Sequence, residues 1–146
     1  MKDKISVILR IIIAILLVQT LYFKWGDHAQ AIHIFDTIGL EPYGRYGLGF
    51  IELVTALLLL LKKTQLKGSL ICILLMIGAV CTHLFTPIGI IVEWDGLNDG
   101  GNLFVLALIC LAFSIANLIL NKERHHFDLK TIIKELKDYF LCGLLI

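Results

Sequence analysis

The sequence contains few of the residues that interrupt helices or carry charge. It has two prolines in 146 residues, and only 17% of its residues are charged. The net charge of +1 supplies no basic field for nucleic acid, so we expect no nucleic-acid partner. Hydrophobic residues make up 58% of the chain and the mean hydropathy is +0.87, whereas an average soluble domain is about 45–50% apolar. The composition therefore predicts an integral membrane protein, with the lipid bilayer as a partner.

The four cysteines lack the spacing of a redox or metal motif. Cys72 and Cys81 fall on opposite faces of one predicted helix, while Cys110 and Cys142 are isolated. Disulfide exchange needs a close dithiol such as Cys-x-x-Cys, so the spacing argues against this chemistry within the chain. The sequence also lacks a His-x-x-His or His-Glu-x-x-His motif. We predict no metal site and leave any catalytic residue unassigned.

Four hydrophobic segments have about the 20 residues that span a bilayer. They cover residues 5–23, 43–61, 69–86 and 102–120, and Pro87 ends the third. Residues 29–35 are predicted to form a short surface helix that ends at Gly39, and residues 62–68 a tight basic hairpin. We therefore predict an all-α fold, an integral membrane antiparallel four-helix bundle over residues 1–121. Residues 122–146 are predicted to form a C-terminal amphipathic interfacial helix, because apolar residues recur there at helical spacing opposite lysines.

Basic residues are unevenly divided between the two sides of this bundle. The N-terminal tail, the hairpin at residues 62–68 and the C-terminal segment carry most of them. The opposite side has only Lys24 and Arg45 in its first loop and neither lysine nor arginine in its second. Because short cytoplasmic loops are enriched in lysine and arginine, both termini are predicted to be cytoplasmic.

Polar residues from all four predicted spans converge on the outer half of the bundle. An ionisable group such as Glu52 costs at least ~2.5 kcal/mol inside the hydrocarbon, so it needs a partner or a packed interior. Stripes of small residues beside Glu52 and His83 place both side chains inside the bundle. The candidate intramembrane polar or ligand site comprises Gln19, Lys24, Glu52, His83, Asp99 and Asn102.

These residues allow more than one interpretation. A Glu52–His83 pair could titrate near neutral pH and relay protons or bind a polar head group. Alternatively, Glu52, His83 and Lys24 only satisfy one another and fix the helix packing. On the inner side, Arg10 is predicted to extend toward the cytoplasmic interface, with Asn117 as a candidate partner.

Short motifs are spread along residues 8–120, namely Gln19–Lys24, Phe35, Gly39–Pro42, Gly44-Arg45, Glu52-Leu53, His83-Leu84, Gly89-Ile90, Asp99–Gly101 and Leu103-Phe104. In combination they resemble the DoxX family of small bacterial membrane proteins. The resemblance implies four transmembrane helices in the bacterial cytoplasmic (inner) membrane. It also implies an association with redox chemistry, since some relatives are subunits of a thiosulfate–quinone oxidoreductase. Residues 93–98 look like an insertion relative to that family, and the tail after Asn121 lies outside its core.

Three functions remain open at this point. The first is an accessory membrane subunit in redox or quinone-linked chemistry, with a quinone as the candidate cofactor and a membrane or redox protein as the candidate partner. The alternative is a non-enzymatic scaffold whose polar residues set packing and whose basic tail docks a partner. The third is a small transporter, although four short helices enclose little space for a transport pathway. The sequence decides neither enzymatic activity nor whether the chain forms a homo-oligomer.

Overall fold

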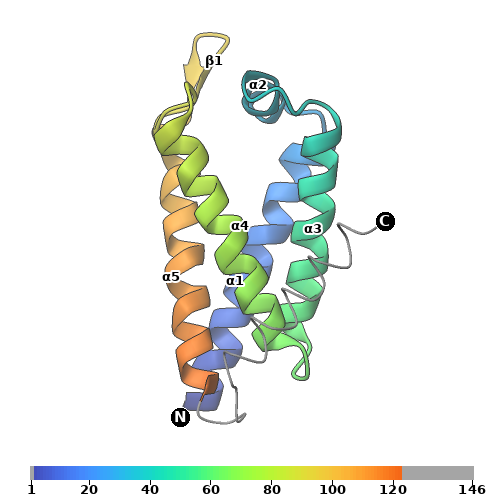
Figure 1. Ribbon diagram of the computed structural model, residues 1–146, viewed down its shortest axis with the longest axis vertical. Helices are drawn as coiled ribbons and strands as arrows, with labels where there is room; N and C mark the ends of the chain where they lie inside the picture. Colours follow the sequence, from blue (N-terminus) through green and yellow to red (C-terminus); the bar gives the residue numbers. More distant parts are fainter. Residues whose placement is uncertain (1, 123–146) are drawn as a thin grey trace, which may run out of the picture.

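The computed structural model describes residues 2–122, which form five helices and one two-stranded hairpin (Figure 1). Four of the helices are long and apolar enough to cross a membrane, which confirms the predicted all-α membrane bundle. The predicted C-terminal tail lies outside the described residues, apart from Lys122. The elements are α1 (Lys2–Trp25), α2 (Ala29–Thr37), α3 (Tyr43–Leu60), α4 (Gln65–Phe85), β1 (Glu93–Trp94), β2 (Leu97–Asn98) and α5 (Asn102–Lys122).

The four long helices form a ring in which each packs against two neighbours. Helix α1 packs against α3 and α5, and α4 packs against the same two helices. Figure 1 shows the α1–α3 pair and the α4–α5 pair lying farther apart at the end that carries α2 and the hairpin. The predicted stripes of small residues beside Glu52 and His83 face the interior, and a similar stripe on α5 does so too. Their buried members are Gly49, Glu52, Thr55, Ala56, Cys72, Met76, His83, Ala107, Cys110, Ser114 and Asn117.

The start of α4 differs from the prediction. We expected Gly68 to belong to a hairpin loop and the helix to begin at Ser69, but α4 begins at Gln65. A Cβ atom on Gly68 would lie 2.8 Å from the backbone nitrogen of Leu59. Gly68 therefore lets α4 approach the end of α3 closely, which is a common use of glycine in membrane helices. From the sequence alone, a glycine at a close helix contact looks the same as a glycine that ends a helix.

The two connections at the opposite end are built by local turn chemistry. Gly39, at a φ of 71°, ends α2, and Leu40 N–H donates to the carbonyl oxygen of Phe35 in a Schellman arrangement. Asp95 and Gly96, both with positive φ, turn the β1–β2 hairpin. Asp-Gly favours this kind of two-residue turn. We had interpreted the same segment only as an insertion in a loop.

Buried polar side chains join α1, α4 and α5 at the lower end of Figure 1. Ser6 Oγ donates to Asn117 Oδ1 at 2.7 Å, and Asn117 Nδ2 donates to Ser69 Oγ at 2.8 Å. Asn121 Nδ2 donates to Ser6 Oγ at 2.8 Å. Satisfied hydrogen bonds of this kind are typical of contacts between membrane helices.

Arg10 does not pair with Asn117, which corrects the prediction for the inner side. Its Nη1 donates to the carbonyl oxygen of Leu59 at 3.1 Å, and its Nε donates to that of Ser6 at 3.3 Å. Arg10 is also buried, with 7% of its surface exposed. Leu59 lies in the last turn of α3, where carbonyl groups lack helical partners and carry partial negative charge. The end of α3 thus supplies the polar partner that we had sought in Asn117.

We expect Gly68→Ala to destabilise the bundle, because its methyl group would meet the backbone of α3. The loss is about 1–3 kcal/mol of unfolding free energy, the usual cost of overpacking a core. Denaturant unfolding in mixed micelles, followed by circular dichroism, measures it. Gly78→Ala is the matched control on the same helix, where an added Cβ atom meets nothing within 4 Å. Equal stabilities of the two variants would contradict the close approach.

Candidate functional site

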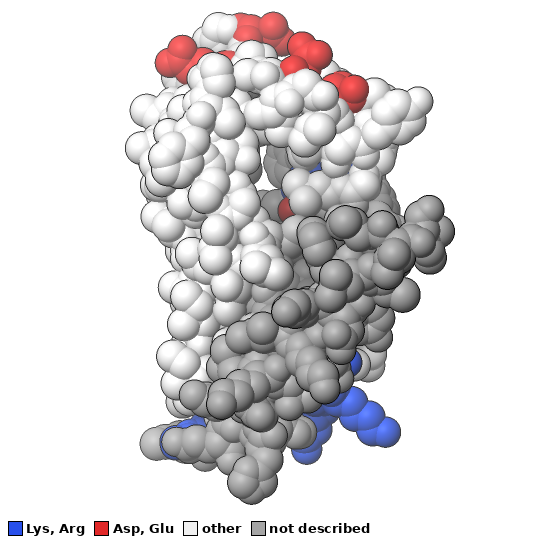
Figure 2. All heavy atoms as spheres, in the orientation of Figure 1, with Lys and Arg blue, Asp and Glu red and all other residues white. Residues whose placement is uncertain are grey.

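Charged side chains divide the described molecule into two ends (Figure 2). The acidic end holds α2, the hairpin and the adjoining helix ends. The lysine end holds the N-terminus of α1, the α3–α4 turn and the end of α5. Figure 2 also shows a hollow on the side of the molecule below the acidic end, with acidic and basic atoms visible inside it. The acidic end contains Asp27, Asp36, Glu41, Glu93, Asp95 and Asp99, and the lysine end contains Lys2, Lys4, Lys62, Lys63 and Lys67.

Glu52 is paired with Lys24 inside the acidic half of the bundle. Lys24 Nζ lies 2.9 and 2.7 Å from the two carboxylate oxygens, and 13% and 6% of the two side chains are exposed. Thr20, one turn before Lys24, donates to Glu52 Oε2 at 2.9 Å. Helical side chains lean toward the N-terminus of their helix. Because α1 and α3 are antiparallel, Lys24 leans into the bundle and Glu52 leans toward the acidic end, so they meet.

The other two charged or titratable candidates have local structural partners. His83 is buried, and its Nδ1 donates to the carbonyl oxygen of Gly89 at 2.7 Å. Its ring also packs edge-on against Phe104, with 5.7 Å between ring centroids. The hydrogen bonds of Glu52 go to Lys24 and Thr20, so the structure does not form the Glu52–His83 pair that we considered.

Asp99 stabilises the entry into α5 through its carboxylate. One carboxylate oxygen accepts the N–H groups of Val92 at 2.8 Å and Gly101 at 2.9 Å. The other oxygen accepts the N–H of Leu103 at 3.0 Å. An aspartate before the first turn satisfies N–H groups that lack helical partners and complements the helix dipole. Asp99 thereby links the hairpin strand region to the start of α5.

A cavity of about 460 Å³ lies at the acidic end between α1, α2, β1 and α5. Ligand pockets usually enclose about 300–1,000 Å³ and have mainly apolar walls with a few polar groups. This cavity follows that pattern, with aromatic and aliphatic side chains around a polar minority. Four of the six candidates line it, namely Gln19, Lys24, Asp99 and Asn102, together with Thr20, Phe23, Gln30, Ala31, Ile34, Phe35, Trp94, Leu103 and Leu106. Glu52 adjoins it through Lys24, and His83 is not among the lining residues.

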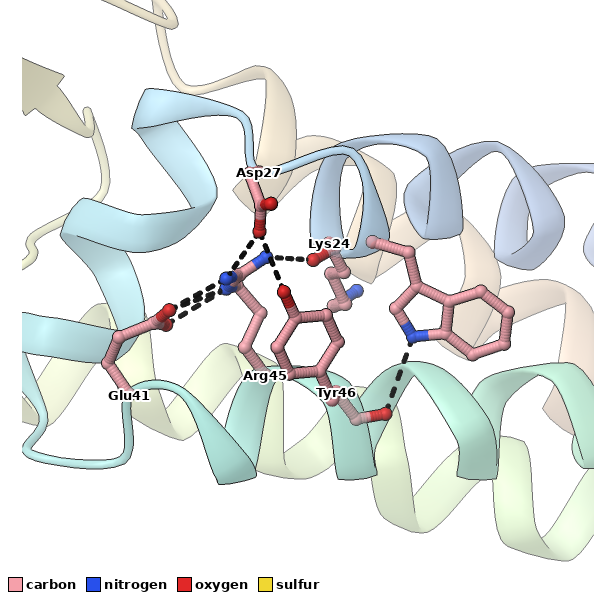
Figure 3. A network of polar contacts seen from close by, with 6 residues as sticks. Lys24, Asp27, Glu41, Arg45 and Tyr46 are labelled. Atoms are coloured by element: carbon pink, nitrogen blue, oxygen red, sulfur yellow. Dashed lines mark hydrogen bonds and ion pairs between the residues drawn. The ribbon is translucent and has the colours of Figure 1, made fainter.

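Arg45 forms a network that the sequence did not reveal (Figure 3). Its guanidinium donates to both carboxylate oxygens of Glu41 at 2.7–2.9 Å, to Asp27 Oδ1 at 2.8 Å and to the carbonyl oxygen of Lys24. Tyr46 also donates to Asp27 Oδ1 at 2.8 Å. The hydrogen bond from Tyr46, followed by that from Arg45, lowers the pKa of Asp27 below its usual value. Asp27 therefore remains ionised at neutral pH and holds its place beside Arg45.

This network fixes both ends of the helix that roofs the cavity. Asp27 lies just before α2 and Glu41 lies just after it, and both bind the same Arg45. Arg45 itself is 2% exposed, so a bidentate carboxylate contact is available to it with little competition from water. We had counted Arg45 only as a loop cation. Arg45 belongs to the motifs of the DoxX resemblance, where Gly44-Arg45 follows Glu41-Pro42, but these motifs do not indicate which residues Arg45 binds.

The fold and the site together define a small multi-pass membrane protein with a polar cluster at one end of its bundle. The family model described as "Methylamine utilisation protein MauE" matches residues 2–91, which is more than half of the chain. The chain belongs to the MauE family. The match supports the general kind of protein that the DoxX resemblance implied, although through a different family. It includes α1 to α4 and ends before the hairpin and α5. No curated protein and no solved structure matches the chain.

We expect Arg45→Met to release α2 from the bundle, because one substitution removes the bonds at both ends of the helix. Hydrogen exchange of the α2 amides should accelerate at least tenfold, the consequence of losing about 1.4 kcal/mol or more of local stability. Mass spectrometry of the detergent-solubilised protein measures this exchange. Arg10→Met, which removes a buried arginine distant from α2, should leave the α2 amides protected. If both variants change α2 equally, the network does not hold this helix.

Proposed function

We propose that this protein is an accessory subunit in redox-linked membrane chemistry that binds the head group of a small amphipathic molecule. The binding site is the cavity at the acidic end, beside the Lys24–Glu52 pair. A quinone is the ligand class implied by the DoxX resemblance. The observation that carries the proposal is a ligand-sized cavity with an apolar wall and a buried ion pair at its edge.

The two family relationships support this function from different directions. The name of the matching family associates it with methylamine utilisation. The DoxX resemblance associates the polar motifs around Lys24 and Glu52 with redox and quinone-linked proteins. Neither relationship supplies a reaction for this chain. We therefore assign it binding and partner support within a membrane redox system, with a redox protein of the same membrane as the candidate partner.

The alternative is a scaffold in which the same polar residues only stabilise helix packing. One observation favours it: both carboxylate oxygens of Glu52 are already bonded to side chains of α1. Removing one partner from a buried ion pair costs about 3–5 kcal/mol, so this pair contributes to the fold under either proposal. The scaffold proposal differs because it requires no occupant in the cavity.

We also propose that the acidic end faces away from the cytoplasm, with both termini cytoplasmic in a bacterial inner membrane. The five lysines of the lysine end support this orientation through the positive-inside rule. Among the described residues, the only lysine and arginine at the acidic end are Lys24 and Arg45, and both are bound to carboxylates within the protein.

Labelling of single cysteines tests the orientation. In a background without the native cysteines, Asp95→Cys should react with a membrane-impermeant maleimide in intact spheroplasts. Lys63→Cys, in the α3–α4 turn, should react only after the membrane is permeabilised. The reverse pattern would contradict the proposed topology.

Quenching of Trp94 fluorescence tests ligand binding, because Trp94 lines the cavity and Trp25 is the only other tryptophan. In nanodiscs, a Trp25→Phe variant should show saturable quenching by decylubiquinone. Ala31→Phe, which fills the cavity, should abolish saturation. Ala112→Phe is the matched control, since Ala112 is exposed on α5 and does not line the cavity. Quenching that never saturates, or that Ala31→Phe leaves unchanged, would favour the scaffold.

A further inference from the structure

We infer that the cavity selects an electrically neutral amphipath whose head group accepts hydrogen bonds, such as a carbonyl compound. In this inference, the side-chain amide of Gln30 and the ammonium group of Lys24 hold the acceptor oxygen. The inference rests on the proposed binding function and adds to it the charge and the hydrogen-bonding character of the ligand. It follows from which polar groups around the cavity are already bonded and which are not.

Two of the side chains that line the cavity carry donors that are not fully used. Gln30 lines the cavity, and its buried Nε2 atom has no hydrogen-bond partner among the residues that the structure describes. A buried unpaired amide donor costs about 1–3 kcal/mol, so an acceptor placed there is stabilised. The Lys24 ammonium has three N–H donors and bonds to the two oxygens of Glu52. Two donors from different helices, α1 and α2, thus border one apolar space.

The two carboxylates at the cavity already accept hydrogen bonds within the protein, which disfavours a cationic ligand. The carboxylate oxygens of Glu52 accept bonds from Lys24 and Thr20. The carboxylate oxygens of Asp99 accept three backbone N–H groups at the start of α5. An ammonium head group would therefore have to displace an existing bond. A charge left without a partner in such a site is strongly destabilised.

The charge balance of the acidic end disfavours an anionic ligand as well. Glu52 neutralises the charge of Lys24 at short distance. The ammonium group can therefore donate a hydrogen bond to a ligand, but the ion pair has no net positive charge to attract an anion. The roof and hairpin above the cavity carry Asp27, Asp36, Glu93 and Asp95. Like charges repel over about 8–10 Å at physiological ionic strength. A neutral acceptor satisfies the two donors without this repulsion.

Competition among three decyl compounds of similar size tests the inference in the Trp25→Phe protein. Decylbenzoquinone, a neutral acceptor, quenches Trp94 and serves as the reporter ligand. Decylbenzene lacks an acceptor, and decylbenzenesulfonate is a permanent anion. We expect the inhibition constant of each of the other two compounds to be at least tenfold higher than the Kd of decylbenzoquinone. Equal displacement by decylbenzene would overturn the acceptor requirement, and preferential displacement by the sulfonate would overturn the charge selection.

Variants of the two donors complete the test. Gln30→Leu should raise the Kd of decylbenzoquinone about threefold to tenfold, the effect of losing one hydrogen bond. Gln65→Leu is the matched control, because Gln65 is buried at the lysine end with its own unpaired oxygen. Lys24→Met combined with Glu52→Gln removes the ion pair without leaving a buried charge and should also raise the Kd. An unchanged Kd in both donor variants would overturn the assignment. Absence of saturable binding in the parent protein would instead overturn the proposed function itself.

Discussion

The requirement that a charge inside the bilayer must be neutralised within the protein governs the acidic half of this bundle. Glu52 satisfies it through Lys24 and Thr20, which lie one turn apart on α1. The pair forces α1 and α3 into contact at that depth, and α1 packs against α3 more extensively than against α5. The α4–α5 pair carries no equivalent counter-charge at this level among the described residues. The two pairs can therefore lie apart at the acidic end, where the cavity forms.

The two buried arginines meet the same requirement with different partners. Arg45 uses carboxylates on either side of α2, and Arg10 uses carbonyl oxygens, including that of Leu59 near the end of α3. Carboxylates are available at the acidic end because its connections are polar. At the lysine end acids are scarce, and the unpaired carbonyl groups of a helix end are the remaining acceptors. Each arginine thus ties α1 to α3, one at each end of the pair.

The sequence predicted the spans well because they depend on length and hydropathy. The predicted start at residue 43 and the predicted start at Asn102 match α3 and α5. It also placed Gln19, Lys24, Asp99 and Asn102 at one end, since antiparallel helices fix depth. Partner choice was less predictable. Glu52 lies near the middle of α3 and His83 close to the end of α4, and only the packing shows that Lys24 is the partner of the carboxylate.

Arg45 shows why local patterns leave part of a site undetermined. Its partners Asp27 and Glu41 are separated by the whole of α2, so the network depends on how that helix folds back. The geometry couples the roof of the cavity to the wall that bears the ion pair, because Arg45 also binds the backbone of Lys24. A movement of α2 must therefore disturb contacts at the residue that pairs with Glu52. The helix that roofs the cavity, Arg45 and the ion pair are thus joined by one continuous series of contacts between α2, α3 and α1.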